Sequence, residues 1–254
     1  HMLCVRDACT QVQVRVAYVD SRGKVRAAFE QLLSAQECEA LMAPLLEAYM
    51  RRRQMIRRHI RARNASLCAL QFPFSAYRAG QREMAVQVYT AIRMGRRLFA
   101  GMPTGTGKSA ATLFPALKAL GMGLTDQVYY LTARTTQRQG PLDALRRMRA
   151  QPLHLWTLVL DAKDKQCPHR TVCHPDWCQR AKGHFLRDAQ AMDQMLREED
   201  WSPERIRQVA QEHQLCPFEF SLSLAELADF VVCDYNYALD PAVHIQRVFE
   251  RTSS

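Results

Sequence analysis

The sequence predicts an α/β fold, in which a parallel sheet has helices on both faces and is interrupted by a small, mostly helical segment. Three observations carry this prediction. From residue 72 onward, short apolar runs alternate with helical patterns, as in sheets whose parallel strands are joined by crossover helices. A glycine-rich turn separates one such run from a helix. Residues 161–218 then break the alternation with cysteines and polar residues.

Length and composition exclude several classes of protein. The 254 residues are 48% hydrophobic and 24% charged, which suffices for a core and excludes disordered and fibrous chains. No apolar run reaches the ~18–20 residues that cross a bilayer, and no leader peptide is recognisable, so we expect a cytoplasmic protein without a membrane partner. Nine cysteines are too few for a secreted disulfide scaffold, so clustered ones are expected to bind metal.

The first 70 residues predict a strand, a turn and a basic helix. Apolar residues alternate over 12–18, and Ser21-Arg22-Gly23 follows as a turn. Ser34 and Glu37 form a capping box that opens a helix. This helix continues into an arginine run, which we expect to be a solvated face, with a stripe that follows phosphates as the alternative. The run consists of Arg51, Arg52, Arg53, Arg57, Arg58, Arg61 and Arg63. The net charge of +10 likewise favours a polyanionic partner without deciding one.

The rest of the chain predicts four strands. They are expected over 98–100, 127–131, 153–160 and 230–233, with helices over 108–121 and 140–149. Residues 161–218 are expected to hold two polar helices and no strand.

Residues 103–109 read Pro-Thr-Gly-Thr-Gly-Lys-Ser and predict a phosphate-binding loop. Gly105 and Gly107 permit positive φ and bring N–H groups against phosphate oxygens, and the following helix directs its amino end at the same anion. Lys108 is expected to reach the β- and γ-phosphates and the Ser109 hydroxyl to ligate Mg²⁺. The strict motif has glycine where this chain has Met102, so the loop fits the helicase variant that begins with Pro-Thr-Gly. Upstream, the amide of Gln81 suits an adenine edge.

Four cysteines have a spacing that suggests a metal site. Cys167, Cys173, Cys178 and Cys216 are separated by five, four and 37 residues, and Pro217 follows the last. Four thiolates can hold a [4Fe–4S] cluster, whereas structural zinc sites prefer Cys-x2–4-Cys pairs. Spacing alone leaves the two metals nearly even. The remaining cysteines are expected to be buried or incidental thiols: Cys4, Cys9, Cys38, Cys68 and Cys233.

In this order, the motifs resemble those of a bacterial superfamily-two DNA helicase of the XPD/DinG type, which carries an iron–sulfur domain. Residues 77–81 resemble the adenine-reading motif, and 103–109 the nucleotide loop. Leu-Thr-Ala-Arg-Thr at 131–135 resembles the motif that contacts single-stranded DNA. Residues 228–241 resemble the strand and turn that precede the Asp-Glu-Ala-His box. The similarity extends from about residue 72 to 250 and tips the metal site toward iron–sulfur.

The resemblance implies a domain organisation and a set of functional residues. Residues 71–160 and 219–254 would form a RecA-like P-loop domain, 161–218 the iron–sulfur insert, and 1–70 a joint that follows a nuclease domain. The implied cofactors are ATP, Mg²⁺ and a [4Fe–4S] cluster, with zinc as the alternative, and the implied partner is single-stranded or forked DNA. The nucleotide residues would be Tyr77, Arg78, Gln81, Thr104, Gly105, Thr106, Gly107, Lys108 and Ser109, the last two being catalytic. The metal ligands would be Cys167, Cys173, Cys178 and Cys216, and the DNA contacts Arg134, Thr135 and Asn236.

Two motor parts are missing from these residues. No Asp-Glu-Ala-His stretch and no second RecA-like domain occur, so the resemblance implies the ATP- and DNA-binding half of a helicase, inactive alone. One alternative is a non-motor P-loop protein with a zinc module. Another is a nucleic-acid-binding module whose loop is vestigial.

Overall fold

The computed structural model describes residues 10–103, 105–168, 174 and 177–249. The chain forms two compact units, of which the first ends at Arg57 and the second begins at Arg58. The boundary falls inside the long helix α2 (Ala35–Ala69), so one helix contributes to both units. None of the described helices has the length and apolar content needed to cross a bilayer.

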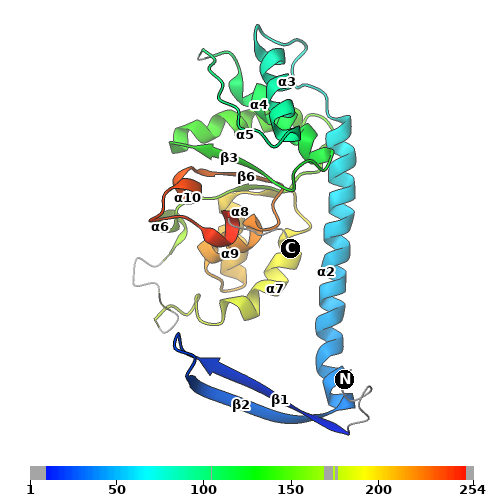
Figure 1. Cartoon of the computed structure of the whole chain (residues 1–254), viewed down its shortest axis with the longest axis vertical. Helices are drawn as coiled ribbons and strands as arrows, with labels where there is room; N and C mark the ends of the chain where they lie inside the picture. Colours follow the sequence, from blue (N-terminus) through cyan, green and yellow to red (C-terminus); the bar gives the residue numbers. More distant parts are fainter. Residues whose placement is uncertain (1–9, 104, 169–173, 175–176, 250–254) are drawn as a thin grey trace. The chain divides into compact units, whose positions relative to one another are not determined.

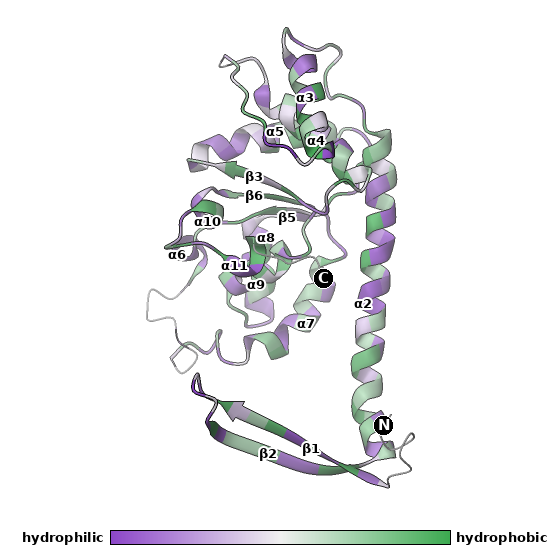
Figure 2. Cartoon of the chain, viewed as in Figure 1, coloured by the Kyte–Doolittle hydropathy of each residue, from purple (hydrophilic) through white to green (hydrophobic). Residues whose placement is uncertain are grey.

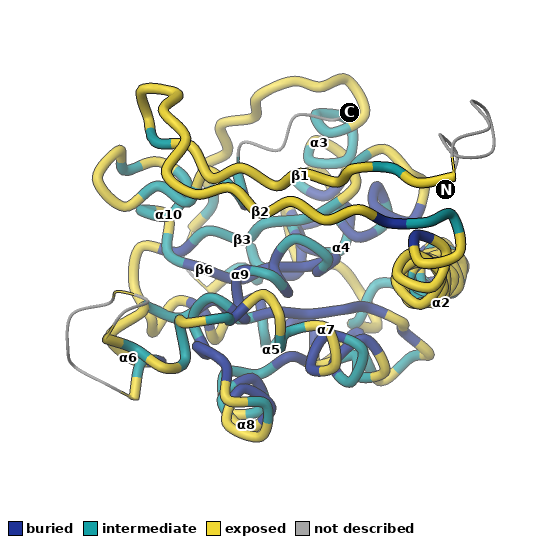
Figure 3. Tube along the Cα trace, turned by 90° about the horizontal axis from the view of Figure 1, so that it is seen from below, coloured by how far each residue is buried: buried dark blue, intermediate teal, exposed yellow. Residues whose placement is uncertain are grey.

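The first unit is a β-hairpin followed by the amino-terminal part of α2 (Figure 1). Strands β1 (Gln11–Val19) and β2 (Val25–Ser34) pair in antiparallel fashion, and Gly23 turns between them with φ +76°. The predicted first strand is confirmed. Strand β2 was not predicted because adjacent apolar residues, Ala27-Ala28 and Leu32-Leu33, break its alternation. Figure 3 shows the hairpin exposed along most of its length.

The predicted capping box opens helix α2. The Ser34 amide donates to Glu37 Oε2 at 2.8 Å, and the Glu37 amide donates to Ser34 Oγ at 3.3 Å. Figure 2 shows the helix changing from hydrophobic to hydrophilic where the arginine run begins. Most of that run is exposed, as a solvated face requires.

The second unit is built on a four-stranded parallel sheet. Its order is β3 (Val128–Thr132), β6 (Phe230–Asp234), β4 (Thr157–Val159) and β5 (Asp200–Trp201). The predicted strands over 127–131 and 230–233 are confirmed to within one residue. The strand predicted over 153–160 is shorter, and the expectation of no strand in 161–218 is wrong because β5 pairs with β4.

The strand predicted over 98–100 does not form. Residues 96–103 are irregular, and Phe99 is 94% exposed. A strand of a parallel sheet forms only by hydrogen-bonding to a neighbouring strand. None of the described strands pairs with this segment, although β3 is the terminal strand at one end of the sheet.

Helices cover both faces of the sheet, as predicted. Figure 1 shows α4 (Lys108–Gly121) and α5 (Gln139–Met148) on one side, and α8 (Pro203–Glu212) and α9 (Pro217–Ala225) on the other. The first pair buries a core against β6 that includes Leu113, Leu117, Leu145, Met148, Phe230 and Val232. The other described helices are α3 (Gln81–Arg93), η1 (Thr135–Arg138), α6 (Lys163–Gln166), α7 (His184–Met195), α10 (Asn236–Leu239) and α11 (Gln246–Phe249). This mixed α/β arrangement is compatible with a RecA-like fold.

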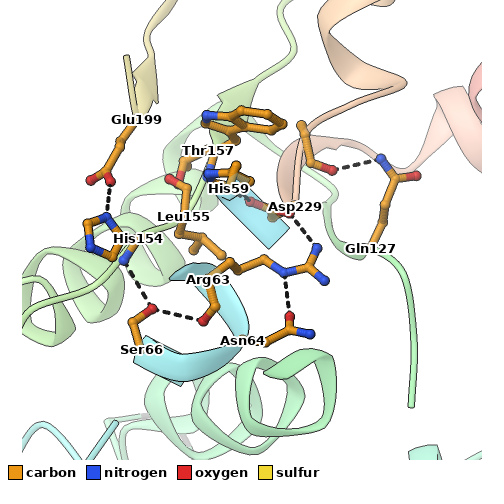
Figure 4. A network of polar contacts seen from close by, with 12 residues as sticks. His59, Arg63, Asn64, Ser66, Gln127, His154, Leu155, Thr157, Glu199 and Asp229 are labelled. Atoms are coloured by element: carbon orange, nitrogen blue, oxygen red, sulfur yellow. Dashed lines mark hydrogen bonds and ion pairs between the residues drawn. The ribbon is translucent and has the colours of Figure 1, made fainter. Parts of the chain in front are cut away.

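A buried network fastens the carboxyl-terminal part of α2 to the sheet (Figure 4). Asp229, directly before β6, accepts hydrogen bonds from Arg63 Nη1 at 2.6 Å and from the Trp156 amide at 2.9 Å. His59 Nε2 lies 2.6 Å from the same carboxylate, and its ring stacks on Trp156 at 3.5 Å. The expectation of a solvated arginine face is therefore wrong for Arg63, because this guanidinium neutralises a buried carboxylate.

Candidate nucleotide and nucleic-acid sites

The predicted phosphate loop lies directly before α4 and has the expected glycine conformations. Gly105 and Gly107 have φ +80° and +81°, and Gly107 is the residue that caps the amino end of the helix. A Cβ on Gly107 would lie 2.3 Å from Gln81 Nε2, so a side chain there is excluded by space as well as by conformation. Thr104 lies outside the described residues.

Two residues of the predicted adenine motif contact this loop. Gln81 is 2% exposed, and its Nε2 donates to the carbonyls of Thr106 at 2.8 Å and Gly107 at 3.3 Å. Its Oε1 accepts the amide hydrogen of Arg78 at 2.8 Å, and Arg78 Nη1 donates to the Gly105 carbonyl at 2.8 Å. The motif thus braces the loop, a role that the sequence prediction of an adenine contact did not include.

Tyr77, which lies just before α3, belongs to a group of aromatic side chains. Its ring stacks on Phe72, with centroids 3.9 Å apart and planes 19° apart, and Phe72 also packs edge-on against Phe114 of α4. Tyr77 itself remains 38% exposed. One ring face is therefore occupied by the protein, while part of the side chain stays accessible to a planar ligand.

The Lys108 side chain folds back into the loop. Its Nζ donates to the carbonyls of Met102 at 2.9 Å and Pro103 at 3.4 Å. Thr106 Oγ1 also donates to the Pro103 carbonyl, at 2.8 Å. The ammonium group therefore sits at the amino end of α4, where the helix dipole favours an anion. A phosphate entering this loop would meet a cation already in place.

Ser109 has two neighbours that the sequence reasoning missed. The Tyr130 hydroxyl, on β3, donates to Ser109 Oγ at 3.3 Å. A Cβ on Gly140, near the start of α5, would lie 2.8 Å from the same oxygen. No spacing along the chain links these residues to the loop. Of the two, only Tyr130 had a signal in the sequence: it lies in a predicted strand, where alternate side chains face the same side, and one side of that strand could face α4.

The three predicted DNA contacts come together at the carboxyl ends of the parallel strands. Arg134, Thr135 and Asn236 all line a cavity of about 640 Å³, where β3 and β6 end. Ligands of open parallel sheets bind at this edge. The other residues lining it are Ala133, Thr136, Arg138, Ala162, Lys165, Asp234, Tyr237 and Val243.

The walls of this cavity are fixed by polar contacts. Arg138 pairs with Asp161, which follows β4, and both side chains are largely buried. The Asn236 amide donates to Asp234 Oδ1 at 2.9 Å, which fixes the start of α10. Burial raises the pKa of Tyr237, so its hydroxyl stays uncharged in more alkaline solution than that of an exposed tyrosine. Arg134 and Lys165 are exposed, and they give the cavity a positive rim.

The proposed metal ligands lie at the ends of short elements. Cys167 follows α6, Cys178 lies in a turn, and Cys216 is the buried residue that caps the amino end of α9 before Pro217. Cys173 lies outside the described residues. Within the described ranges, no three His, Cys, Asp or Glu side chains are close enough together to hold a metal ion.

Contacts nevertheless link the segments that carry these three cysteines. Helix α6, which Cys167 follows, contacts α9, which Cys216 precedes. Arg180, two residues after Cys178, donates to the Leu215 carbonyl at 3.2 Å, and the Cys216 amide donates to His184 Nδ1 at 3.4 Å. Cys233 differs from them: it is fully buried in β6, as expected for an incidental thiol.

Comparison with known proteins adds one finding about this unit. A search of curated proteins found no match to the chain. In a scan against family models, residues 134–252 match the model of the DEAD_2 family. The matched segment includes the four cysteines and every residue that lines the cavity at the sheet edge except Ala133, and it begins after the phosphate loop. This part of the chain therefore matches a domain of DEAD/DEAH-type helicases such as XPD and DinG.

Proposed function

We propose that the chain is the ATP- and single-stranded-DNA-binding half of an ATP-dependent DNA helicase. The DEAD_2 match supports a helicase-type, nucleotide-binding function. Beyond it, the proposal assigns ATP and Mg²⁺ to the loop at 103–109 and a DNA strand to the cavity at the ends of β3 and β6.

One observation carries the proposal: a single short segment touches both sites. Arg134 and Thr135 line the cavity, and Gly140, six residues after Arg134, packs against the Ser109 hydroxyl. A change at the nucleotide loop would have a short path to the DNA cavity, through the start of α5 and η1. A motor needs such a connection, whereas a vestigial loop does not.

Each residue of the loop has a physical task in this function. The N–H groups at Gly105 and Gly107 and the Lys108 ammonium would neutralise phosphate charge, and Ser109 would ligate Mg²⁺. Tyr77 and Arg78 would border the base. Because the Gln81 amide is engaged with the loop, an adenine contact would require it to share or release one of those bonds. Without an Asp-Glu-Ala-His stretch to activate water, this chain alone should hydrolyse ATP hardly or not at all.

The cysteines would hold a [4Fe–4S] cluster in a domain that acts where the duplex separates. The proposal rests on the chemistry of the donor set, since Cys167, Cys173, Cys178 and Cys216 supply four thiols, although those that the structure describes are not gathered into a metal-binding group. A bound cluster would tie these short elements together. Trp177 and Phe185, 80% and 67% exposed on the same segment, are candidates to stack on bases. The proposed partner is single-stranded or forked DNA in the cytoplasm, and residues 1–70 would be the joint to a nuclease domain if the full-length parent carries one.

The nucleotide assignment is tested by Lys108→Ala. We expect this variant to lose Mg-ATP affinity, measured by titration calorimetry, and to keep its affinity for single-stranded DNA. Lys24→Ala, in the hairpin turn of the other unit, is the control and should bind ATP like the wild type. Unchanged ATP affinity in Lys108→Ala would mean that the loop is not a phosphate site.

The DNA assignment is tested by Arg134→Ala, with affinity for a labelled single strand measured over a range of salt concentrations. Losing one phosphate contact should weaken binding and lower the salt slope by about 0.7. Arg146→Ala removes an exposed arginine of α5 that pairs with Asp143, so it is the matched control and should change neither quantity. An equal effect of both variants would indicate general attraction to a basic surface.

The metal content of the purified protein separates the two candidate functions. A brown preparation that contains iron and sulfide would support the helicase, whereas a zinc-containing one would support a non-motor P-loop protein.

A further inference from the structure

The middle of helix α2 carries a concentration of positive charge that the proposed function does not use. No Asp or Glu occurs between Glu47 and Glu83, and the whole arginine run lies in this interval. Its exposed members are Arg51, Arg53, Arg57, Arg58 and Arg61. Arg51 lies 3.9 Å from Glu47, but the other four form no ion pair with any residue that the structure describes.

Helix geometry places three of these arginines in one row. Successive residues of an α-helix are turned by about 100°, so Arg53, Arg57 and Arg61, each four residues apart, lie along the same side. His59 lies two residues from both Arg57 and Arg61, which is about 200° around the axis, and its side chain is held against Asp229. The row therefore faces away from the side of α2 that is fixed to the sheet. Because α2 is one continuous helix, this follows from the helix alone.

The row has the spacing and the chemistry of a surface for phosphates. Its three guanidinium groups are spread over about 12 Å of the helix axis, and duplex DNA presents about one negative charge per 1.7 Å of its length. A guanidinium can donate two parallel hydrogen bonds to one phosphate, and it is always charged. Like charges four residues apart destabilise a helix, so a bound polyanion would also remove a repulsion within α2.

Neighbouring residues decide between the kinds of polyanion. Between Tyr49 and Phe72 the sequence has no Phe, Tyr or Trp, so the row has no such ring on which unpaired bases could stack. A helix that lies on an anionic membrane needs an apolar face to insert. The opposite side of this stretch is already engaged, since Arg63 pairs with Asp229 and Leu67 is fully buried. The phosphate backbone of a duplex therefore fits better than a single strand or a lipid surface.

We propose that Arg53, Arg57, Arg58 and Arg61 form a second nucleic-acid surface, which binds the phosphate backbone of duplex DNA without reading its sequence. None of these four arginines is among the residues that line the cavity at the ends of β3 and β6. Duplex binding by α2 does not depend on that cavity or on the nucleotide loop. If the proposed function also holds, the duplex arm of a forked substrate is the part that α2 binds.

The test measures the affinity of the full chain for a blunt, labelled DNA duplex by fluorescence anisotropy over a range of salt concentrations. The triple variant Arg53→Gln, Arg57→Gln, Arg61→Gln keeps a good helix former at each position and removes three charges. We expect its duplex affinity to fall at least about tenfold and its salt slope to fall by about 2.7, at about 0.9 for each lost phosphate contact. Circular dichroism should show unchanged helix content.

A second triple variant is the matched control. The substitutions Arg15→Gln, Arg26→Gln and Arg146→Gln remove the same charge from exposed arginines that already pair with a carboxylate. This variant should bind the duplex like the wild type. The same loss in both triple variants would mean that net charge alone attracts DNA, and it would overturn the proposal. Wild-type binding to phosphatidylserine vesicles but not to the duplex would overturn it as well.

Arg134→Ala separates this surface from the cavity of the proposed function. It should weaken binding of a single strand and leave the duplex affinity unchanged, whereas the triple variant on α2 should weaken duplex binding more than single-strand binding. Wild-type duplex affinity in the triple variant would overturn the surface on α2 while the assignment of the cavity stands.

Discussion

At the scale of a single residue, Gly107 shows how the local backbone shapes the proposed phosphate loop. Its φ of +81° costs any other residue about 1–2 kcal/mol. Gln81, whose Nε2 is 2.3 Å from the position of a Cβ, is buried and held by three hydrogen bonds, so it cannot simply move aside. We predict that Gly107→Ala lowers Mg-ATP affinity at least about tenfold, which corresponds to about 1.4 kcal/mol.

The matched control for this substitution is Gly95→Ala. Gly95 also has positive φ, +61°, but a Cβ there would meet nothing within 4 Å. This variant should lose stability in urea unfolding by a similar backbone cost and keep its ATP affinity. If both variants lose affinity alike, the cause is general strain and not the contact between Gly107 and Gln81.

Cys233 gives a second prediction at this scale, concerning pH. Burial raises the pKa of its thiol to about 12, so at about pH 8.5 the native protein holds very little thiolate there. We expect iodoacetamide to label exposed Cys68 readily and Cys233 only after unfolding, as read by peptide mass spectrometry.

Because the folded pKa of the Cys233 thiol exceeds the unfolded one, the stability due to the neutral thiol is present below about pH 9 and declines as pH rises toward 12. In Cys233→Ala, the free energy of unfolding should fall less between about pH 9 and 12 than in the wild type. Fast labelling of Cys233 in the native protein would contradict its burial.

Among the secondary-structure elements, the segment from Arg134 through η1 to the start of α5 joins the two sites. Gly140 leaves room for Ser109 Oγ, which a Cβ would approach to 2.8 Å. We predict that Gly140→Ala displaces this hydroxyl and reduces the Mg²⁺-dependent part of ATP affinity, while binding without Mg²⁺ is unchanged. Gly101→Ala, where a Cβ meets nothing within 4 Å, should leave both affinities as they are. Equal losses with and without Mg²⁺ would show that the whole loop has moved.

The same elements show what the sequence can and cannot predict. Helix α4 was predicted with its observed ends because glycines mark both of them, and the capping box located the start of α2. Strands β2 and β5 were missed, and the strand at 98–100 was wrongly expected, because a strand depends on a neighbour that is distant in the chain. The bracing role of Gln81, the Tyr130 contact and the Asp229 network are tertiary contacts without a local pattern. The cavity was not predicted; the family motifs only assigned Arg134, Thr135 and Asn236 a common role, and all three line it.

The two units divide the whole molecule at a place that composition does not reveal. The basic character of α2 continues past Arg57, yet His59, Arg63, Leu67 and Leu70 belong to the second unit. Leu67 and Leu70 are buried in its core, while His59 and Arg63 hold Asp229. The end of α2 is therefore part of the second unit.

Two shortened chains test this division. A chain that begins at Arg58 keeps the whole network and should unfold cooperatively in urea with wild-type ATP affinity. A chain that begins at Gln71 removes both partners of the Asp229 carboxylate, Arg63 and His59, and also loses Leu67 and Leu70 from the core. We expect this shorter chain to be soluble only in part and to unfold at much lower urea concentration. Asp229→Asn should recover some of its stability, because the unpaired charge is then gone, whereas the same substitution should destabilise the chain that begins at Arg58. Equal stability of the two shortened chains would show that the end of α2 is not part of the second unit.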